Sequence, residues 1–316
     1  MVILKRTLVF ALAACSAFAA DSSLLSLLSP DAKVVAGIYV DRSTASQFGQ
    51  FMLRRMQRED AALNKFVTAT GFDPRRDLTE VIVSSADAQN TGHGLVVAHG
   101  TFDIVRLAAQ AKLSGGFLTN YKDVQVISGK SDGWIAFLDS RTVAAGDAAL
   151  VRAAVDRRGS AVGIDPKLAA KVSEVSGKYD AWMVSIAPLS KFSGKLPDPR
   201  MNGMINGEMV QGIEQASGGV QFGASVQISG EAVTRSEKDA TALADVVRFL
   251  TGMVQMNREK PEMAKFASVL DTMSLKSSAN TLSISLSVPE SDLEQMLKQP
   301  SGNRPVRRAA IQRSVN

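Results

Sequence analysis

The stretch VVAGIYV, residues 34–40, decides the fold class because it is apolar on both sides of an extended strand. Its even-numbered positions carry valine, alanine, isoleucine and valine, and its odd-numbered positions carry valine, glycine and tyrosine. A strand without a polar side is typical of the interior of a sheet that is covered on both faces. Residues 134–138 have the same character, so we expect a second central strand there.

Helical patterns separate the strands that surround these two segments. Read coarsely, the order strand–helix–helix–strand occurs three times, at residues 33–85, 142–186 and 218–277. This repeat predicts an α+β fold of mainly antiparallel sheet, with helix pairs on one face. We expect two lobes, whose arrangement is broadly similar to the ferredoxin-like fold. A local echo, GFDPR at 71–75 against GIDPK at 163–167, is weak evidence for a duplication.

Residues that begin and end helices support these assignments. Gly71 is suited to the left-handed position after a helix. The predicted N-cap residues are Ser43, Asp147, Asp165 and Ser236. Asp165 is followed by proline, which is favoured in the first helical position.

The pattern breaks at residues 187–207, which are rich in proline and glycine. We interpret this segment as the linker between an N-terminal lobe, residues 20–200, and a C-terminal lobe, residues 201–300. After the break we expect a short helix near 208–216 and one extended run from 218 to about 235.

The first nineteen residues are typical of a secretory signal peptide. Lys5 and Arg6 give a charged head, residues 7–14 are apolar, and Ala17-Phe18-Ala19 provides the small residues that signal peptidase requires. The apolar run is shorter than the roughly 20 residues that span a bilayer. The sequence therefore predicts an exported, bacterial protein whose mature chain begins at Ala20.

Cys15 offers an alternative to this cleavage, because Leu12-Ala13-Ala14-Cys15 is similar to the lipidation motif of bacterial lipoproteins. The chain stays apolar past Cys15 and becomes polar only at Asp21, which favours ordinary cleavage. Periplasmic or secreted location is the first prediction, and lipid anchoring in the envelope through Cys15 is the alternative.

Composition excludes several classes of protein. Apolar residues make up 45% of the chain and charged residues 21%, which are ordinary globular values. Cys15 is the only cysteine, so disulfides and iron–sulfur sites are excluded from the mature chain. After the leader, no other segment approaches membrane-spanning length, so we expect attachment to a membrane only through lipid or surface contact.

The net charge of +5 does not predict nucleic-acid binding, because the excess of positive over negative charge lies at the two ends of the chain. Arg304, Arg307, Arg308 and Arg313 all fall in residues 301–316, which we expect to be a disordered basic tail. The alternative for these arginines is contact with an anionic lipid surface or envelope polymer. Binding to anionic liposomes that survives truncation at Ser301 would exclude this role.

Residues 29–42 (SPDAKVVAGIYVDR) and 70–78 (TGFDPRRDL) resemble the opening parts of exported bacterial α+β proteins of unknown function. The resemblance covers roughly the first 90 residues of the mature chain. It implies an exported α+β protein, and its motifs are structural, so it carries no active-site residue.

Motifs with catalytic potential are few. Gly129-Lys130-Ser131-Asp132-Gly133 matches the G-x-S-x-G pattern of serine hydrolases, but it falls between two predicted strands instead of before a helix. The only histidines, His93 and His99, precede it in one predicted strand, about 20 Å apart, and cannot share a metal ion. A hairpin turn is the better interpretation of the motif, and we predict no metal and no cofactor.

Other candidate groups have structural explanations. The carboxylates of Glu59-Asp60 and of Asp73 with Asp77 lie among arginines, which is typical of a charge-compensated surface. Met201, Met204 and Met209 suit either an adaptable groove or a gap between lobes. The sequence therefore favours a non-catalytic binding or scaffolding protein of the cell envelope, acting on an unidentified protein or envelope component. The alternative is an exported hydrolase whose site is dispersed among loops.

Overall fold

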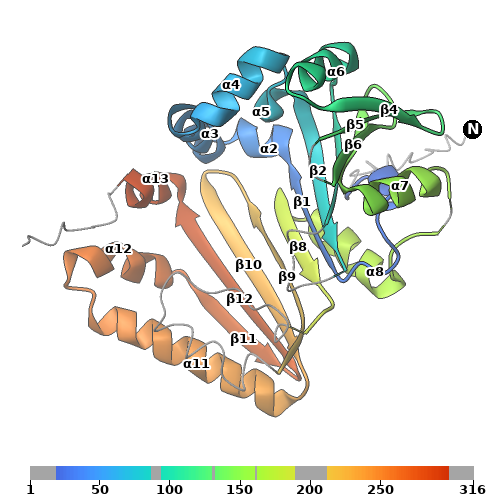
Figure 1. Ribbon diagram of the computed structural model, residues 1–316. Helices are drawn as coiled ribbons and strands as arrows, with labels where there is room; N and C mark the ends of the chain where they lie inside the picture. The colour runs from blue at the N-terminus through green and yellow to red at the C-terminus, as the bar shows by residue number, and fades with distance from the viewer. Residues whose placement is uncertain (1–18, 87–93, 130–131, 161, 189–211, 299–316) are drawn as a thin grey trace, which may run out of the picture.

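The computed structural model describes residues 19–86, 94–129, 132–160, 162–188 and 212–298 (Figure 1). The leader up to residue 18, including Cys15, and the basic tail with Arg304, Arg307, Arg308 and Arg313 lie outside the described residues. So do His93, Ser131 and the three methionines of residues 201–209.

Twelve strands form one sheet within the described residues. The order across the sheet is β11-β12-β10-β9-β8-β1-β2-β3-β7-β6-β5-β4, and every neighbouring pair is antiparallel. The strands are β1 Val34–Tyr39, β2 Leu78–Ser85, β3 Leu95–Gly100, β4 Phe117–Tyr121, β5 Val124–Ser128, β6 Gly133–Phe137, β7 Thr142–Asp147, β8 Ala181–Ser185, β9 Ile213–Gln221, β10 Ser225–Thr234, β11 Ser274–Ser278 and β12 Thr281–Pro289.

The helices of the described residues fall between these strands or beside the ends of the chain. They are α1 Ser22–Leu25, α2 Val40–Ala45, α3 Gln47–Glu59, α4 Ala61–Thr70, α5 Pro74–Asp77, α6 Ile104–Leu113, α7 Ala148–Arg157, α8 Pro166–Ser176, α11 Glu237–Met256, α12 Pro261–Leu270 and α13 Glu290–Lys298. The predicted α+β class with a mainly antiparallel sheet is confirmed. The division into two lobes and the ferredoxin-like arrangement stay predictions.

Helices cover both faces of the sheet, so the expectation that helix pairs lie on one face is wrong. On one face, which we call the α7–α8 face, Val35, Ile82 and Trp182 pack with α7 and α8 in the main hydrophobic core. On the other, the cavity face, α4 and α6 lie over β2, β3, β6 and β7. The physical reason is that β1 is apolar on both sides, and β2 and β3 carry apolar residues on both, so each side must be covered.

The C-terminal strands differ, because only one of their faces is apolar. The strand register places Ile38 in one row with Ala181, Val220 and Ile228 on the cavity face. α11 and α12 pack against β10, β11 and β12, which carry that apolar face. The opposite face carries the polar residues Ser217, Glu231 and Ser283.

Several local predictions are confirmed and several are wrong. Gly71 has φ +72° and ends α4, and Asp165 caps α8 by accepting hydrogen bonds from the amides of Lys167 and Leu168. Asp147 is the N-cap residue of α7, although its carboxylate makes no capping hydrogen bond. Ser43 lies inside α2, where its hydroxyl donates to the carbonyl of Tyr39, so it is not an N-cap.

The expected helix near 208–216 is wrong for residues 213–216, which belong to β9. The single extended run from 218 to 235 is two strands, because the chain turns at residues 222–224 between β9 and β10. Small residues such as Gly218 and Gly219 weaken the strand pattern here, and the alternation that would have located the turn is lost.

Candidate functional site

An apolar cavity of about 640 Å³ lies on the cavity face, between the sheet and helices α4 and α6. Strands β2, β3, β6 and β7 form its floor, because their alternating side chains on this face are all apolar. Its volume falls within the range of about 300–1,000 Å³ that is typical of small-molecule sites. The floor is lined by Leu78, Val81, Val96, Ala98, Ile135, Phe137, Val143 and Ala145.

Four phenylalanines form a connected wall of this cavity. Phe66 of α4 meets Phe72 edge to face, with ring centroids 6.3 Å apart. Phe72 stacks on Phe102 at 5.4 Å, and Phe102 packs against Phe137 of β6 at 6.3 Å. Phe102 and Phe137 are buried, whereas Phe66 is 42% exposed. The wall therefore runs from the core to the mouth of the cavity.

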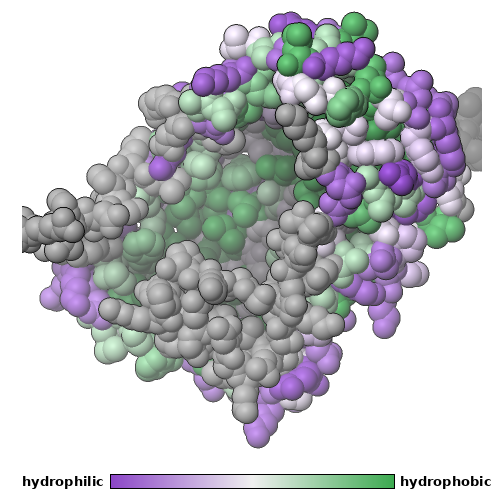
Figure 2. Space-filling model, in the orientation of Figure 1, coloured by the Kyte–Doolittle hydropathy of each residue, from purple (hydrophilic) through white to green (hydrophobic). Residues whose placement is uncertain are grey.

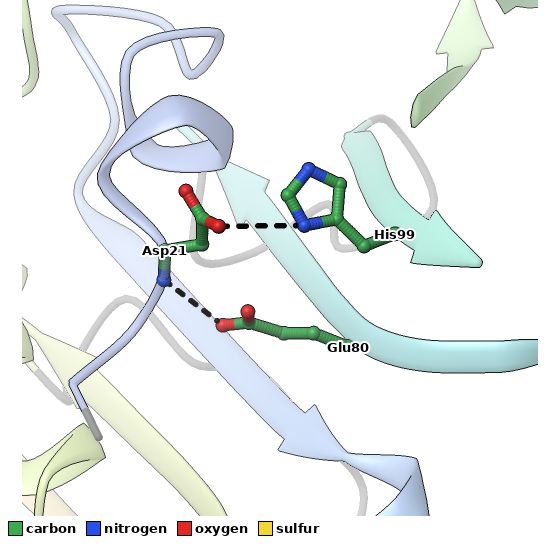
Figure 3. Close-up of side chains that lie close together, drawn as sticks. All are labelled: Asp21, Glu80 and His99. Atoms are coloured by element: carbon green, nitrogen blue, oxygen red, sulfur yellow. Dashed lines mark hydrogen bonds and ion pairs between the residues drawn. The ribbon is translucent and has the colours of Figure 1, made fainter. Parts of the chain in front are cut away.

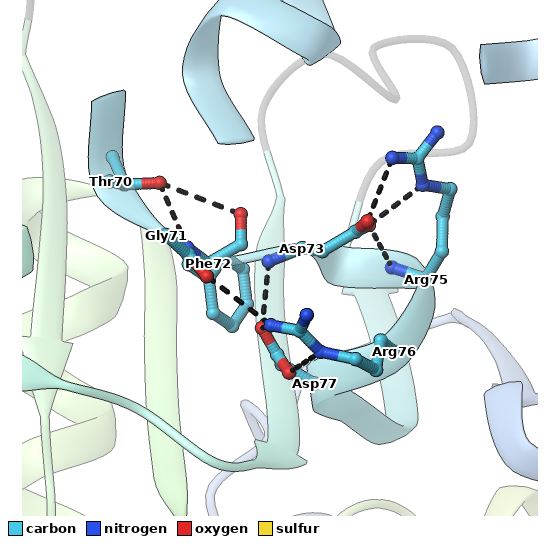
Figure 4. Close-up of polar contacts among 7 residues, drawn as sticks. All are labelled: Thr70, Gly71, Phe72, Asp73, Arg75, Arg76 and Asp77. Atoms are coloured by element: carbon cyan, nitrogen blue, oxygen red, sulfur yellow. Dashed lines mark hydrogen bonds and ion pairs between the residues drawn. The ribbon is translucent and has the colours of Figure 1, made fainter. Parts of the chain in front are cut away.

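The loop between α4 and β2 fixes Phe72 in this wall (Figure 4). The hydroxyl of Thr70 accepts a hydrogen bond from the Phe72 amide, and Gly71 provides the left-handed turn. Asp73 caps the short helix α5 and holds Arg75 by two hydrogen bonds of 2.7 Å. Asp77 accepts from the amide of Asp73, which closes the turn.

These carboxylates are structural groups, as the sequence predicted. The hydrogen bonds from Arg75 hold the pKa of Asp73 below its usual value, and those from Arg76 do the same for Asp77. Asp60 is the N-cap of α4, where its carboxylate accepts from the amide of Leu63. Each of the three carboxylates is thus used in holding the backbone beside the cavity.

A second cavity of about 740 Å³ adjoins the first and shares Ala111, Ile127 and Ile135 with it. It extends toward the connection between β5 and β6, where Ser128 and Asp132 give it a polar end. This connection contains the G-x-S-x-G sequence, and it joins two adjacent antiparallel strands. The hairpin interpretation of the motif is therefore confirmed for its described residues, Gly129, Asp132 and Gly133.

The cavity face stays apolar beyond α4 and α6. Ile38, Val83, Met183 and Ile228 are each more than a third exposed and lie on this face of the sheet. Figure 2 shows a hollow with an apolar floor near the middle of the molecule, between the upper helices and the α11–α12 layer. The cavity is thus the closed end of a longer apolar surface.

A polar cluster occupies the α7–α8 face at the end of β2 and β3 (Figure 3). Glu80 and His99 are direct partners in the β2–β3 register, and the segment before α1 brings Asp21 onto them. Glu80 is 7% exposed, and its carboxylate accepts a 3.3 Å hydrogen bond from the Asp21 amide. His99 Nδ1 lies 3.5 Å from the Asp21 carboxylate.

The pKa of Glu80 is raised to about 7, mainly by burial and also by the charge of Asp21, whereas the hydrogen bond from the Asp21 amide and the charge of Arg42 act to lower it. Burial also opposes ionisation of Asp21, but hydrogen bonds from Ser23 and the nearby His99 together lower its pKa. One donor atom from each of Asp21, Glu80 and His99 lies within 4.8 Å of the others, so these residues could hold a cation.

With Ser23, the cluster has a serine, a histidine and an aspartate arranged in the order found in serine hydrolases. Its hydroxyl lies 3.5 Å from Nε2 of His99, whose other nitrogen faces Asp21. None of the cavities described above is lined by these three residues. Sequence reasoning missed the cluster, because its members come from three segments that only the sheet register and the docking of α1 bring together.

The described residues also locate the predicted cleavage site. Ala19 is exposed, and Ala20 is 8% exposed and belongs to the main hydrophobic core. Among the helices of the described residues, none combines the length and the apolar character needed to cross a membrane.

No family model matches the chain, and a search of curated proteins finds no match. Among solved structures, the chain is similar to TP0453. Crystal form I of that protein aligns with a TM-score of 0.53, covering 89% of this chain and 98% of TP0453. Crystal form III aligns with a TM-score of 0.56, covering 88% and 98%. At 8% sequence identity, the likeness concerns the fold alone.

Proposed function

We propose that this chain is an exported, non-catalytic binding protein of the bacterial envelope that holds an elongated apolar molecule of the fatty-acyl kind. The observation that carries the proposal is the apolar cavity of about 640 Å³ beneath α4 and α6. Its walls and floor are almost entirely hydrocarbon, so a ligand there gains by removing its own apolar surface from water.

The distribution of polar groups supports an elongated ligand over a compact one. Polar side chains line the cavity only at a few positions, which include Lys65, Thr70 and Gln110 on the helices above the floor. The adjoining cavity continues the space toward a polar end at Ser128 and Asp132. A chain-like molecule can lie along the hydrocarbon surface while its polar head stays at such an edge.

A fluorescence experiment tests this function. N-phenyl-1-naphthylamine, an apolar dye, should become fluorescent in the protein, and palmitate should displace it. Ala111→Trp on α6 fills the space shared by both cavities and should weaken dye binding at least tenfold. Val105→Trp is the matched control, because this residue of the same helix is 82% exposed and does not line the cavity.

Two results would overturn the acyl-binding proposal. One is an absence of dye binding by the folded wild-type protein. The other is equal loss of binding in both tryptophan variants, which would assign the dye to a surface other than the cavity. Equal melting temperatures for the two variants and the wild type would show that the fold is intact.

Export is tested separately by the intact mass of the protein from its native host. A mass that corresponds to Ala20–Asn316 in the periplasmic fraction would support a free binding protein. A diacylglyceryl-modified chain that begins at Cys15, found in the membrane fraction, would support a lipid-anchored one. An uncleaved chain in the cytoplasm would exclude both.

Ester hydrolysis is the second candidate function, and the observation that favours it is the order of Ser23, His99 and Asp21. The experiment is turnover of p-nitrophenyl acetate by the wild type and by Ser23→Ala. Loss of turnover only in the variant would support a hydrolase, whereas equal rates would exclude Ser23 as a nucleophile.

A further inference from the structure

The buried position of Ala20 gives the predicted signal-peptide cleavage a structural consequence. Its backbone nitrogen donates a 2.9 Å hydrogen bond to Oγ of Ser176, which is fully buried at the end of α8. Ala19, one residue earlier, is exposed. The chain therefore enters the core at the bond that signal peptidase is expected to cut.

Glu80 lies beside this position with its carboxylate almost fully buried. The amide of Asp21 donates a hydrogen bond to Oε1 of Glu80. The nitrogen of Ala20 is the backbone nitrogen immediately before this donor. Tyr39 lies between Glu80 and Ser176, because it interacts with the carboxylate of the first and the hydroxyl of the second. Burial and the charge of Glu80 raise the pKa of Tyr39 to about 12, so it is a neutral neighbour.

We propose that removal of the leader after Ala19 creates an ammonium group on Ala20 that forms a buried ion pair with Glu80 and donates to Ser176. Hydrolysis of the Ala19–Ala20 peptide bond consumes one water molecule, leaves a carboxylate on Ala19 and releases the nitrogen of Ala20 as an amine. This amine is largely protonated at pH 7, because α-amino groups have pKa values of about 7.7–8.0. The inference rests on the proposed export and adds a binding site for the new chain end.

The surrounding charges favour a cation at this position. The negative charges of Asp21 and Asp41 act on Glu80, which accepts from the residue next to Ala20, and His99 faces Asp21. The guanidinium of Arg42 lies 4.0 Å from the centre of the Tyr39 ring, and its charge acts on Glu80 less strongly than burial does. An ammonium with three donors can satisfy Ser176 and Glu80 at once, which an amide with one donor cannot.

Processing at Cys15 would leave Ala20 as an amide within the chain, so the ion pair distinguishes the two predicted routes of export. In a chain with that amide, the pKa of Glu80 of about 7 lies above its ordinary value of 4.5. The folded state then holds its proton more tightly than the unfolded state, and stability is lost as the pH rises from about 4.5 through 7. The ammonium should remove this loss.

The experiment compares a chain that begins at Ala20 with one that begins at Ser16 and keeps four residues before Ala20. Cytoplasmic expression with a removable initiator methionine gives both. The carboxyl pKa of Glu80, followed by ¹³C NMR, should be near 7 in the Ser16 chain and at least two units lower in the Ala20 chain. Equal pKa values in the two chains would overturn the proposal.

Stability provides the second measurement. At pH 7.5, Glu80→Gln should lower the melting temperature of the Ala20 chain by about 2–4 °C and should not lower that of the Ser16 chain. Glu231→Gln is the matched control, because its partner Lys171 is the same in both chains, and it should lower both equally. A Zn²⁺-dependent rise in both chains, abolished by Glu80→Gln, would assign the cluster to a metal ion and overturn the ion pair.

These readouts separate the ion pair from export itself. The Ala20 chain tests the pairing whether or not the native host produces that chain. A native N-terminus other than Ala20 would contradict the predicted cleavage while leaving the result on the purified chains unchanged.

Discussion

The strands on the two sides of the β8–β9 pair differ in how many of their faces are covered. One row of the register crosses both regions on the α7–α8 face. It runs through Leu95, Ser84, Val35 and Val184, all nearly inaccessible to solvent, and continues through Ser217, Glu231 and Ser283. From β9 to β12 the row has polar side chains, and α8, which packs on β8, contacts β9 and reaches Glu231 of β10 through Lys171.

This difference shows how one continuous sheet can have two roles. The region from β1 to β8 is packed by α7 and α8 on one face and carries α4 and α6 over part of the other, and it holds the cavity, the polar cluster and the position of Ala20. The region from β9 to β12 is packed on one face, by α11 and α12. We therefore expect substitutions in the first region to have larger effects than matched substitutions in the second.

Leu168→Ala should have the largest effect on the unfolding free energy among the substitutions that compare the two regions. Leu168 of α8 is fully buried against the doubly covered region, and its truncation should cost about 2–5 kcal/mol of unfolding free energy. Leu286→Ala on β12, at a half-buried position, should cost less than half as much. Urea denaturation measures both, and equal costs would contradict the distinction between the regions.

Gly37→Ala should follow, at about 1–3 kcal/mol. A Cβ at Gly37 would lie 2.4 Å from the Trp182 ring, so the ring must move within a packed core. Gly230→Ala on β10 is the counterpart, because its Cβ would have Ile284 at 3.3 Å as its nearest neighbour. If thermal denaturation shows that Gly230→Ala is as damaging as Gly37→Ala, the core of the first region is less rigid than argued.

Lys171→Met should have a smaller effect, about 1 kcal/mol, and it tests how the two regions are joined. Lys171 of α8 lies 2.7 Å from Glu231 of β10 and 3.1 Å from Glu174. A double-mutant cycle with Glu231→Gln should give a coupling energy that decreases in 0.5 M salt. Additive effects at low salt would show that this ion pair does not connect the regions.

Ser285→Val on β12 should change the unfolding free energy by no more than about 0.5 kcal/mol. Its side chain is exposed on the polar face, and the β-branched substitute suits a strand. Chemical denaturation of the variant should therefore match that of the wild type. A loss above 1 kcal/mol would mean that the polar face is covered in solution.

Local structure was predictable where single residues determine it. Asp165 with Pro166 begins α8, Ser236 caps α11, and Gly71 ends α4, because each residue acts on its own neighbours in the chain. The apolar character of residues 34–40 on both sides was a correct sign that two faces must be covered. The expectation that helices lie on one face was wrong, because a strand that is apolar on both sides requires helices on both faces of the sheet.

The candidate sites were not predictable from the same patterns. Glu80 and His99 become neighbours only through the β2–β3 register, and Asp21 joins them through the docking of the N-terminal segment. The cavity needs α4 and α6 to stand away from strands whose apolar residues would otherwise contact them. The sequence offered one indication of the cavity. The segment from residue 66 to residue 137 contains more phenylalanines than the apolar faces of its expected helices include.

The position of β1 in the sheet has a consequence for the order in which the chain folds. Val34 pairs with Ser85 on one side and with Ser185 on the other, so the second edge of this strand stays open until residue 185 is available. Contacts that close such long loops form slowly, because the chain loses entropy before the contacts compensate. A chain that crosses a membrane N-terminus first would therefore deliver β1 well before its second partner, and its exposed edge is the one that a chaperone would need to protect.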